Sequence, residues 1–97
     1  MVIIAWNRIS AFCKQHPKAS EPLLRWYLIA LKADWSSAHG LVSDFGFVDS
    51  LGNDRFVFNI KGNDYRLIAM IHFNRRTVYI RFIGTHREYE QIDCSTI

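Results

Sequence analysis

The sequence of 97 residues lacks the features that mark secreted, metal-binding and membrane-spanning proteins. Its two cysteines, Cys13 and Cys94, form neither a metal-ligand spacing nor a disulfide framework. No run reaches the about 18 apolar residues that a membrane-spanning helix needs. The opening segment MVIIAW lacks the basic region and the small-residue cleavage site of a signal peptide. We therefore expect a reduced, cytoplasmic protein that does not enter the membrane.

Internal repeats and low-complexity segments are also missing. Hydrophobic residues make up 49% of the chain and charged residues 22%, which is the composition of a globular protein rather than a disordered one. A chain of this length buries roughly 60 to 70% of its unfolded surface in one core. We expect a single domain over residues 1–97.

The sequence does contain three runs of aromatic and β-branched residues between positions 55 and 87. Such runs are typical of strands, and the short polar breaks at residues 61–64 and 74–76 are typical of hairpin turns. This pattern predicts an antiparallel meander with strands at residues 56–61, 64–73 and 77–85.

Side chains alternate across a strand, so the meander divides into two faces. Two-residue turns would pair Ile60 with Tyr65 and Ile71 with Ile80. The first face is then a wall of the core, made of Phe56, Phe58, Ile60, Tyr65, Leu67, Ala69, Ile71, Phe73, Val78, Ile80 and Phe82. The second face is polar and basic, with Val57, Asn59, Lys61, Arg66, Ile68, Met70, His72, Tyr79, Arg81, Ile83 and Thr85.

This register makes specific predictions about the polar face. Asn59, Arg66 and Thr85 lie in one row across the three strands, and Arg81 lies opposite Met70. Arg66 is then a surface residue that contributes little to the core. A three-residue loop at either turn would shift one strand and break the assignment.

Positive charge is concentrated on the same segment. Residues 55–87 hold seven basic residues and one acidic residue, a net charge of +6, whereas the rest of the chain has five basic and eight acidic residues, a net charge of −3. A basic surface with aromatic residues between the charges attracts polyanions, of which nucleic acid is the commonest. The alternative is a solvated basic surface that has no partner.

Two helices are predicted before the meander, after a buried strand at residues 2–6. The first helix has Asn7 or Ser10 as its cap and ends at Pro17. Its apolar stripe is Ile9, Phe12, Cys13 and His16. The second helix begins near Ser20, and its apolar stripe packs on the sheet. That stripe is Leu24, Tyr27, Leu28, Leu31 and Trp35.

Residues 33–54 are the least regular part of the sequence. A short turn of helix is expected up to Leu41, followed by an abbreviated strand around Phe47, and Asp49 and Ser50 are assigned to a turn. His39 is expected on the surface. The three tryptophans are assigned to the core or to helix packing, and they are Trp6, Trp26 and Trp35.

Candidate chemistry follows the last predicted strand. Thr85 can cap a short closing helix that reaches Ile92, and on that helix His86 and Tyr89 are neighbours because they are three residues apart. Histidine is the side chain best suited to exchange protons near neutral pH. The alternative is that His86 and Tyr89 close the core with one hydrogen bond each.

Several short motifs follow one another in a specific order and spacing. They are Phe56-Val57-Phe58-Asn59, Gly62-Asn63, Tyr65-Arg66-Leu67, Thr85-His86 and Glu88-Tyr89, with Phe12, His16-Pro17, Trp26 and Trp35 earlier in the chain. In these motifs the sequence resembles the HigB toxin family of the RelE-like superfamily, the mRNA interferases of bacterial type II toxin–antitoxin systems. The resemblance covers essentially the whole chain, with two departures from the family pattern: Lys61 stands where glycine is frequent, and Glu90 stands where aspartate is frequent.

The resemblance implies an α+β fold of RelE-like type, in which an N-terminal strand and a two-helix hairpin pack on a mainly antiparallel sheet. It implies a toxin that enters the ribosomal A site, cuts mRNA without a metal or cofactor, and is held inactive by a cognate HigA antitoxin. The free toxin would be a monomer or weak dimer. We expect the catalytic residues to be Arg66, Arg81, His86 and Tyr89, and the RNA-binding residues to be Arg55, Asn59, Lys61, Asn63 and Arg87.

Two other functions remain open at this point. The related ParE toxins use the same scaffold to poison DNA gyrase and lack the catalytic set. A plain RNA-binding module is the third possibility. The His86 and Tyr89 pair, with two strand arginines, favours the nuclease.

Overall fold

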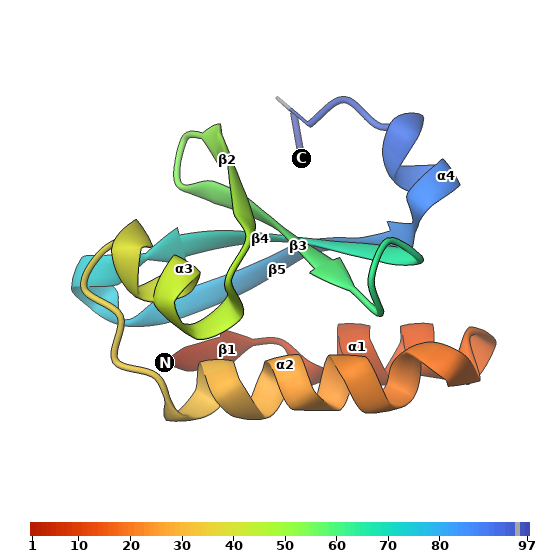
Figure 1. Cartoon of the computed structure of the whole chain (residues 1–97), viewed down its shortest axis with the longest axis horizontal. Helices are drawn as coiled ribbons and strands as arrows, with labels where there is room; N and C mark the ends of the chain where they lie inside the picture. Colours follow the sequence, from red (N-terminus) through yellow and green to blue (C-terminus); the bar gives the residue numbers. More distant parts are fainter. Residues whose placement is uncertain (95) are drawn as a thin grey trace.

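A mixed five-stranded sheet forms the centre of the molecule, with strand order β1-β5-β4-β3-β2 (Figure 1). The computed structural model describes residues 1–94 and 96–97. β1 runs parallel to β5, and the other neighbouring strands are antiparallel. The strands are β1 (Val2–Ile4), β2 (Val48–Gly52), β3 (Arg55–Ile60), β4 (Tyr65–His72) and β5 (Thr77–Thr85). The expected meander is therefore present as β3, β4 and β5.

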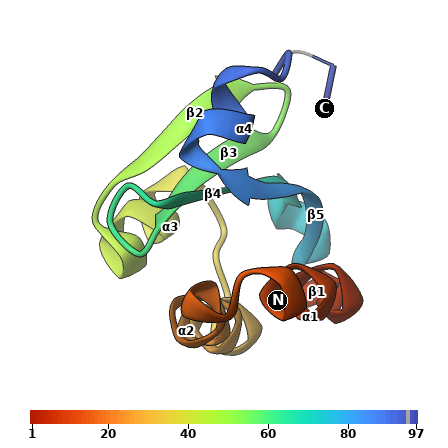
Figure 2. The same cartoon turned by 90° about the vertical axis from the view of Figure 1, so that its right-hand side faces the viewer.

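Helices lie on both sides of this sheet. α1 (Trp6–Gln15) and α2 (Ser20–Lys32) run side by side under one face, and α4 (His86–Glu90) lies above the other (Figures 1 and 2). α3 (Ala38–Phe45) links α2 to β2. This arrangement confirms the expected α+β fold. Within the described residues, no helix combines the length and the apolar character needed to cross a membrane.

The first helix ends as predicted but begins without a polar cap. α1 stops at Gln15, and Pro17 opens a short 3₁₀ turn over Pro17–Ala19. The predicted caps, Asn7 and Ser10, are wrong, because Ala5 occupies the cap position and no side chain bonds to the first turn. The preceding strand is also more exposed than expected. Val2 and Ile4 lie at the surface, since β1 is an edge strand of the sheet.

The predicted apolar stripe of α2 is wrong at its three leucines, although Tyr27 and Trp35 do pack against the core. Leu24, Leu28 and Leu31 remain 44%, 44% and 45% exposed. The face that packs on the sheet is one residue earlier and consists of Leu23, Trp26 and Ala30. Because α2 is apolar around most of its circumference, helical spacing alone could not select the buried side. Trp26 and Trp35 are core residues as expected, whereas Trp6 is 42% exposed beside Tyr27.

The link between the helices and the meander is more regular than its composition suggested. α3 extends to Phe45, and β2 begins at Val48. Asp49 and Ser50 belong to β2 and pair with β3, so their assignment to a turn is wrong. His39 is on the surface, as predicted.

The register of the meander is right at its first turn and wrong at its second. Ile60 pairs with Tyr65 as predicted. Ile71 pairs with Val78 rather than Ile80, because a 3₁₀ turn over Phe73–Arg75 and a left-handed Arg76 lengthen the connection. A shift by two residues preserves the two faces, so the core wall is correct up to Ile80.

A β-bulge at Arg81 then exchanges the faces of the last strand residues. Ile80 pairs with Ala69 and Phe82 with Ile68, so Arg81 has no partner on β4. As a result Ile83 joins the core and Phe82 leaves it, the reverse of the prediction. Bulges insert one unpaired residue and redirect the strand that follows. Gly84 takes the place opposite Arg66 that was predicted for Thr85.

Candidate active site

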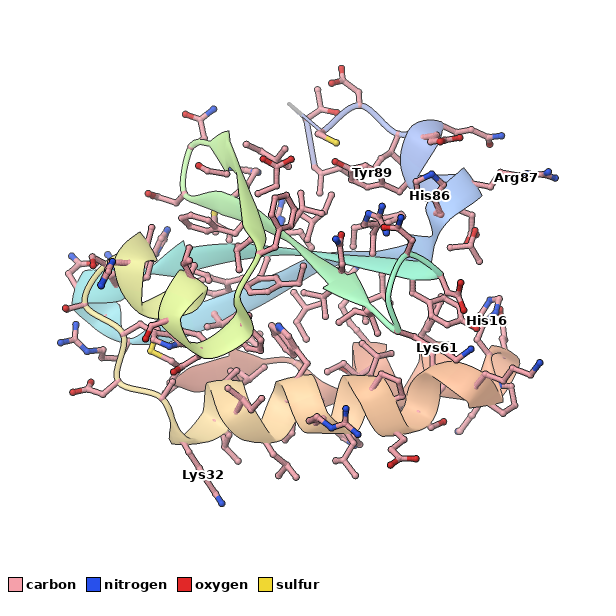
Figure 3. The ribbon with its side chains drawn as sticks, viewed as in Figure 1. His16, Lys32, Lys61, His86, Arg87 and Tyr89 are labelled. Carbon is pink, nitrogen blue, oxygen red and sulfur yellow. The ribbon has the colours of Figure 1, made fainter. Side chains whose placement is uncertain are left out.

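A basic hollow opens where the α1–α2 connection, the β3–β4 turn and the start of α4 meet. Its volume is about 560 Å³. Asp64 is the one carboxylate among its lining residues, and it pairs with Lys61 at 3.1 Å. Figure 3 shows His16, Lys61, His86 and Arg87 on this side of the molecule. The hollow is lined by His16, Lys18, Lys61, Asn63, Asp64, Tyr65, Thr85, His86 and Arg87.

Hydrogen bonds at the start of α4 hold His86 at this hollow. The Thr85 hydroxyl accepts from the Glu88 amide at 3.1 Å, and the Glu88 carboxylate accepts from the Thr85 amide at 2.8 Å, which completes a capping box. The His86 amide donates to the Asp64 carbonyl at 3.0 Å. α4 is thereby tied to the β3–β4 turn, and the prediction of Thr85 as its cap is confirmed.

Loss of this cap should release α4 and with it the His86 side chain. Thr85→Ala is expected to cost about 1 kcal/mol of folding free energy, which lowers Tm by roughly 4 to 8 °C in a domain of this size. Thr85→Ser keeps the accepting hydroxyl and should remain close to wild type. Thermal unfolding followed by circular dichroism measures both, and equal losses in the two variants would contradict the role of the cap.

The His86 imidazole lies against a carboxylate of its own helix, α4. Its Nε2 lies 2.8 Å from Glu90 Oε1, and 47% of the His86 side chain is exposed. A nearby carboxylate stabilises the imidazolium that forms when histidine accepts a proton. Glu90 is therefore a partner that the sequence prediction did not assign, although four-residue spacing on a helix is the signal for it.

Tyr89 points away from His86 and back over the sheet (Figure 3). Its ring lies 5.7 Å from the Arg66 guanidinium carbon. Burial raises the pKa of the Tyr89 phenol above its usual 10.0, and contacts with Cys94 add to this, whereas Arg66 acts in the opposite direction. The Tyr89 hydroxyl is therefore protonated at neutral pH and suited to donate a proton rather than accept one.

Arg66 is buried, contrary to its expected place on an open polar face. Its side chain is 8% exposed, and its two terminal nitrogens donate to Asn63 Oδ1 at 3.0 Å and to the Asn63 carbonyl at 3.2 Å. A third bond goes to the Tyr65 carbonyl at 3.3 Å. Arg66 therefore supports the β3–β4 turn, where Asn63 faces the hollow.

Three other predicted site residues lie outside the hollow. Arg81, at the bulge, lines a separate recess beside α1 with Asn7, Arg8 and Gln15. Arg55 donates to the backbone carbonyls of Ile97 and Asn53 at the far end of β3. Asn59 lines a neighbouring recess that shares Lys61 with the hollow. The predicted set of two arginines, His86 and Tyr89 is thus not gathered at one point.

Other residues reach the hollow although sequence reasoning assigned them no role there. His16, Lys18 and Tyr65 approach from the α1–α2 connection and from the start of β4. The combination of histidine, proline and lysine directly after a helix was the available signal. Among the described residues, no three His, Cys, Asp or Glu side chains gather closely enough to hold a metal ion.

Comparison with known proteins places this sequence in a family. Residues 19–92 match the family described as HigB toxin, RelE-like toxic component of a toxin–antitoxin system. The mRNA interferase toxin HigB of Escherichia coli K12 is 37% identical over 92 residues, which are 93% of this chain and 88% of the relative.

Two further relatives give the same result. The mRNA interferase HigB of Shigella flexneri is also 37% identical over 92 residues, with 93% of this chain and 88% of the relative covered. The mRNA interferase HigB of Escherichia coli O6:H1 is 24% identical over 94 residues, with 95% and 91% covered. The resemblance inferred from the sequence is confirmed, and the chain belongs to the HigB toxin family, the RelE-like toxic components of toxin–antitoxin systems.

Proposed function

We propose that this chain is an mRNA endonuclease toxin that cleaves mRNA in the ribosomal A site and is neutralised by a cognate HigA-type antitoxin. Membership of the HigB family and relatives named mRNA interferase support the endonuclease activity. The observation that supports this location of the active site is the His86–Glu90 pair on the rim of a basic hollow. A ribosomal substrate implies that the protein acts in the cytoplasm, as a monomer or weak dimer when free.

The proposed reaction is attack of a ribose 2′-hydroxyl on the adjacent phosphate. His86 accepts the proton of that hydroxyl, and Glu90 stabilises the imidazolium that results. The new bond joins the 2′-oxygen to phosphorus, and the bond from phosphorus to the 5′-oxygen of the next nucleotide breaks. That oxygen takes up a proton, which leaves a 2′,3′-cyclic phosphate and a 5′-hydroxyl end.

The remaining residues have supporting roles in this proposal. Lys61 and Arg87 line the hollow and stabilise the negative charge that develops on the phosphate. Arg66 acts by holding Asn63, and Tyr89, whose ring lies beside the Arg66 guanidinium, is the candidate proton donor. Arg81 contacts flanking RNA from its own recess rather than the reacting phosphate. Asn59 and Arg55 contact RNA or the ribosome outside the hollow.

The reaction is tested with purified toxin and ribosomes programmed with a short end-labelled mRNA. We expect cleavage at the A-site codon, with cyclic phosphate and 5′-hydroxyl ends identified by their resistance or sensitivity to end-modifying enzymes. Intact mRNA together with inhibited DNA gyrase would instead establish a ParE-like toxin. Bound but uncut mRNA would establish an RNA-binding module.

Salt dependence tests whether the basic hollow is the binding surface. The logarithm of the affinity for ribosomes carrying mRNA should fall with the logarithm of the salt concentration, by about 0.7 for each single-strand phosphate neutralised. Arg87→Ala should reduce the slope by about that amount. Arg75→Ala is the matched control, because Arg75 is exposed but lies outside the hollow. An unchanged slope in Arg87→Ala would show that the hollow is not part of the RNA-binding surface.

A further inference from the structure

One wall of the hollow is aromatic. The His16 imidazole stacks on the Phe12 ring, with centroids 4.4 Å apart and planes inclined by 22°. The Tyr65 ring meets both of these rings edge-on, and its centroid lies 5.7 Å from that of Phe12 and 5.8 Å from that of His16. Phe12 and Tyr65 also pack against the hydrophobic core, so the cluster is supported from beneath.

His16 occupies this wall without a polar partner. Within the described part of the chain, no hydrogen bond or ion pair involves its imidazole, and the ring is partly exposed to the hollow. Among the described residues, the buried side-chain polar atom that lacks a hydrogen-bond partner is Trp26 Nε1, so the ring nitrogens of His16 are open to water rather than buried. The imidazole is therefore accessible to a ligand that enters the hollow.

The surroundings of His16 are those of a single-strand nucleic-acid site. Lys18, Lys61 and Arg87 supply positive charge around the same hollow, and His86 lies across it (Figure 3). Proteins that bind single strands combine a basic groove with aromatic rings on which bases stack. A histidine ring can serve as such a platform.

We propose that His16, supported by Phe12 and Tyr65, is the stacking platform for one nucleobase of the bound mRNA, in a nucleotide next to the bond that is cut. Lys18, two residues further on, is placed to contact a phosphate of the same strand. This inference rests on the proposed endonuclease function and adds a base-binding subsite to it. The subsite reads the flat surface of a base, so it orients the strand without requiring one particular sequence.

The test is a double-mutant cycle in which the protein ring and the RNA base are removed separately and then together. Programmed ribosomes carry mRNA with an abasic nucleotide at one position at a time around the cleaved bond, and cleavage is measured in single turnover over a range of toxin concentrations. His16→Leu fills the space over Phe12 but removes the aromatic surface, whereas His16→Trp retains an aromatic surface. His39→Ala, which changes an exposed histidine on α3, is the matched control.

For intact mRNA, we expect His16→Leu to raise the half-saturating toxin concentration by about 5- to 150-fold, the range measured for loss of one stacked base. The maximal rate should change far less, and His16→Trp should stay near wild type. At the position whose base stacks on His16, an abasic nucleotide should raise the half-saturating concentration of wild-type toxin by a similar factor. The same abasic mRNA should cause almost no further rise in His16→Leu. His39→Ala should behave as wild type throughout.

Additive losses at every abasic position would overturn the proposal, since ring and base would then act independently. Equal impairment of His16→Trp and His16→Leu would do the same. A failure of the proposed function is distinct, because the wild type would then cleave none of the mRNAs. Thermal unfolding of each variant separates a loss of stacking from a loss of folding.

Discussion

Replacement of His86 by alanine should slow mRNA cleavage by about 10² to 10⁴-fold, the usual contribution of a proton-transferring side chain. Ribosome binding should change much less, because Lys61 and Arg87 remain in the hollow. Folding should be unaffected, since the His86 side chain is half exposed and contacts a neighbour on its own helix. Single-turnover cleavage on programmed ribosomes measures the rate, and sedimentation with ribosomes measures binding.

Companion variants separate the roles within this site. Glu90→Gln removes the charge next to His86 Nε2 and should also lower the cleavage rate, but by less than His86→Ala does. Tyr89→Phe removes the hydroxyl without opening a cavity. If His86 and Tyr89 act as one unit, the double variant should be hardly slower than the slower single variant. Near-normal cleavage by His86→Ala, with His39→Ala as the reference, would exclude proton transfer by His86.

Arg66→Ala should destabilise the fold as well as abolish toxicity. Its guanidinium is buried and donates to Asn63 and to the Tyr65 carbonyl, so alanine leaves these acceptors without their partner. Loss of a hydrogen bond from a charged donor costs about 1.5 to 3 kcal/mol. We expect Tm to fall by roughly 4 to 8 °C for each kcal/mol lost. Urea unfolding gives the free energy directly.

This expectation corrects the interpretation of Arg66 as a surface residue with little effect on stability. Arg66→Lys keeps the charge but cannot donate from two nitrogens in the same plane, so it should recover only part of the stability. Arg75→Ala, at an exposed position, should match wild type. Wild-type stability of Arg66→Ala would show that its hydrogen bonds to the β3–β4 turn contribute nothing to folding.

The three strands of the meander, β3, β4 and β5, were predictable from sequence because they are long runs of β-branched and aromatic residues separated by turn residues. The second helix was not, because Leu23 and Leu24 are both apolar and adjacent, and only the packed structure shows that Leu23 faces the core. The bulge at Arg81 has no signature in the sequence, which shows neither glycine nor proline there. Local patterns therefore defined elements, whereas the buried side of α2 depended on distant contacts.

The same distinction applies to the site. Thr85 and His86 were found because a capping residue and a titratable side chain are adjacent in the chain. His16 and Tyr65 are 49 positions apart and meet only when the fold brings the end of α1 to the start of β4. Arg81 was misplaced because the extra residue in β5 was not foreseen.

The bulge in β5 also determines which changes in chain length the protein can accept. Many side chains can replace Arg81, since it is exposed and pairs with no residue of β4. Its deletion would remove the bulge without changing the pairing that follows. In a strand without Arg81, Ile80 opposite Ala69 would be followed directly by Phe82 opposite Ile68, so Phe82, Ile83 and Gly84 would keep their faces and their partners. The position is therefore tolerant of substitution and also of a single-codon deletion, because the register that keeps Thr85 and the start of α4 in phase with the rest of the sheet does not depend on the extra residue.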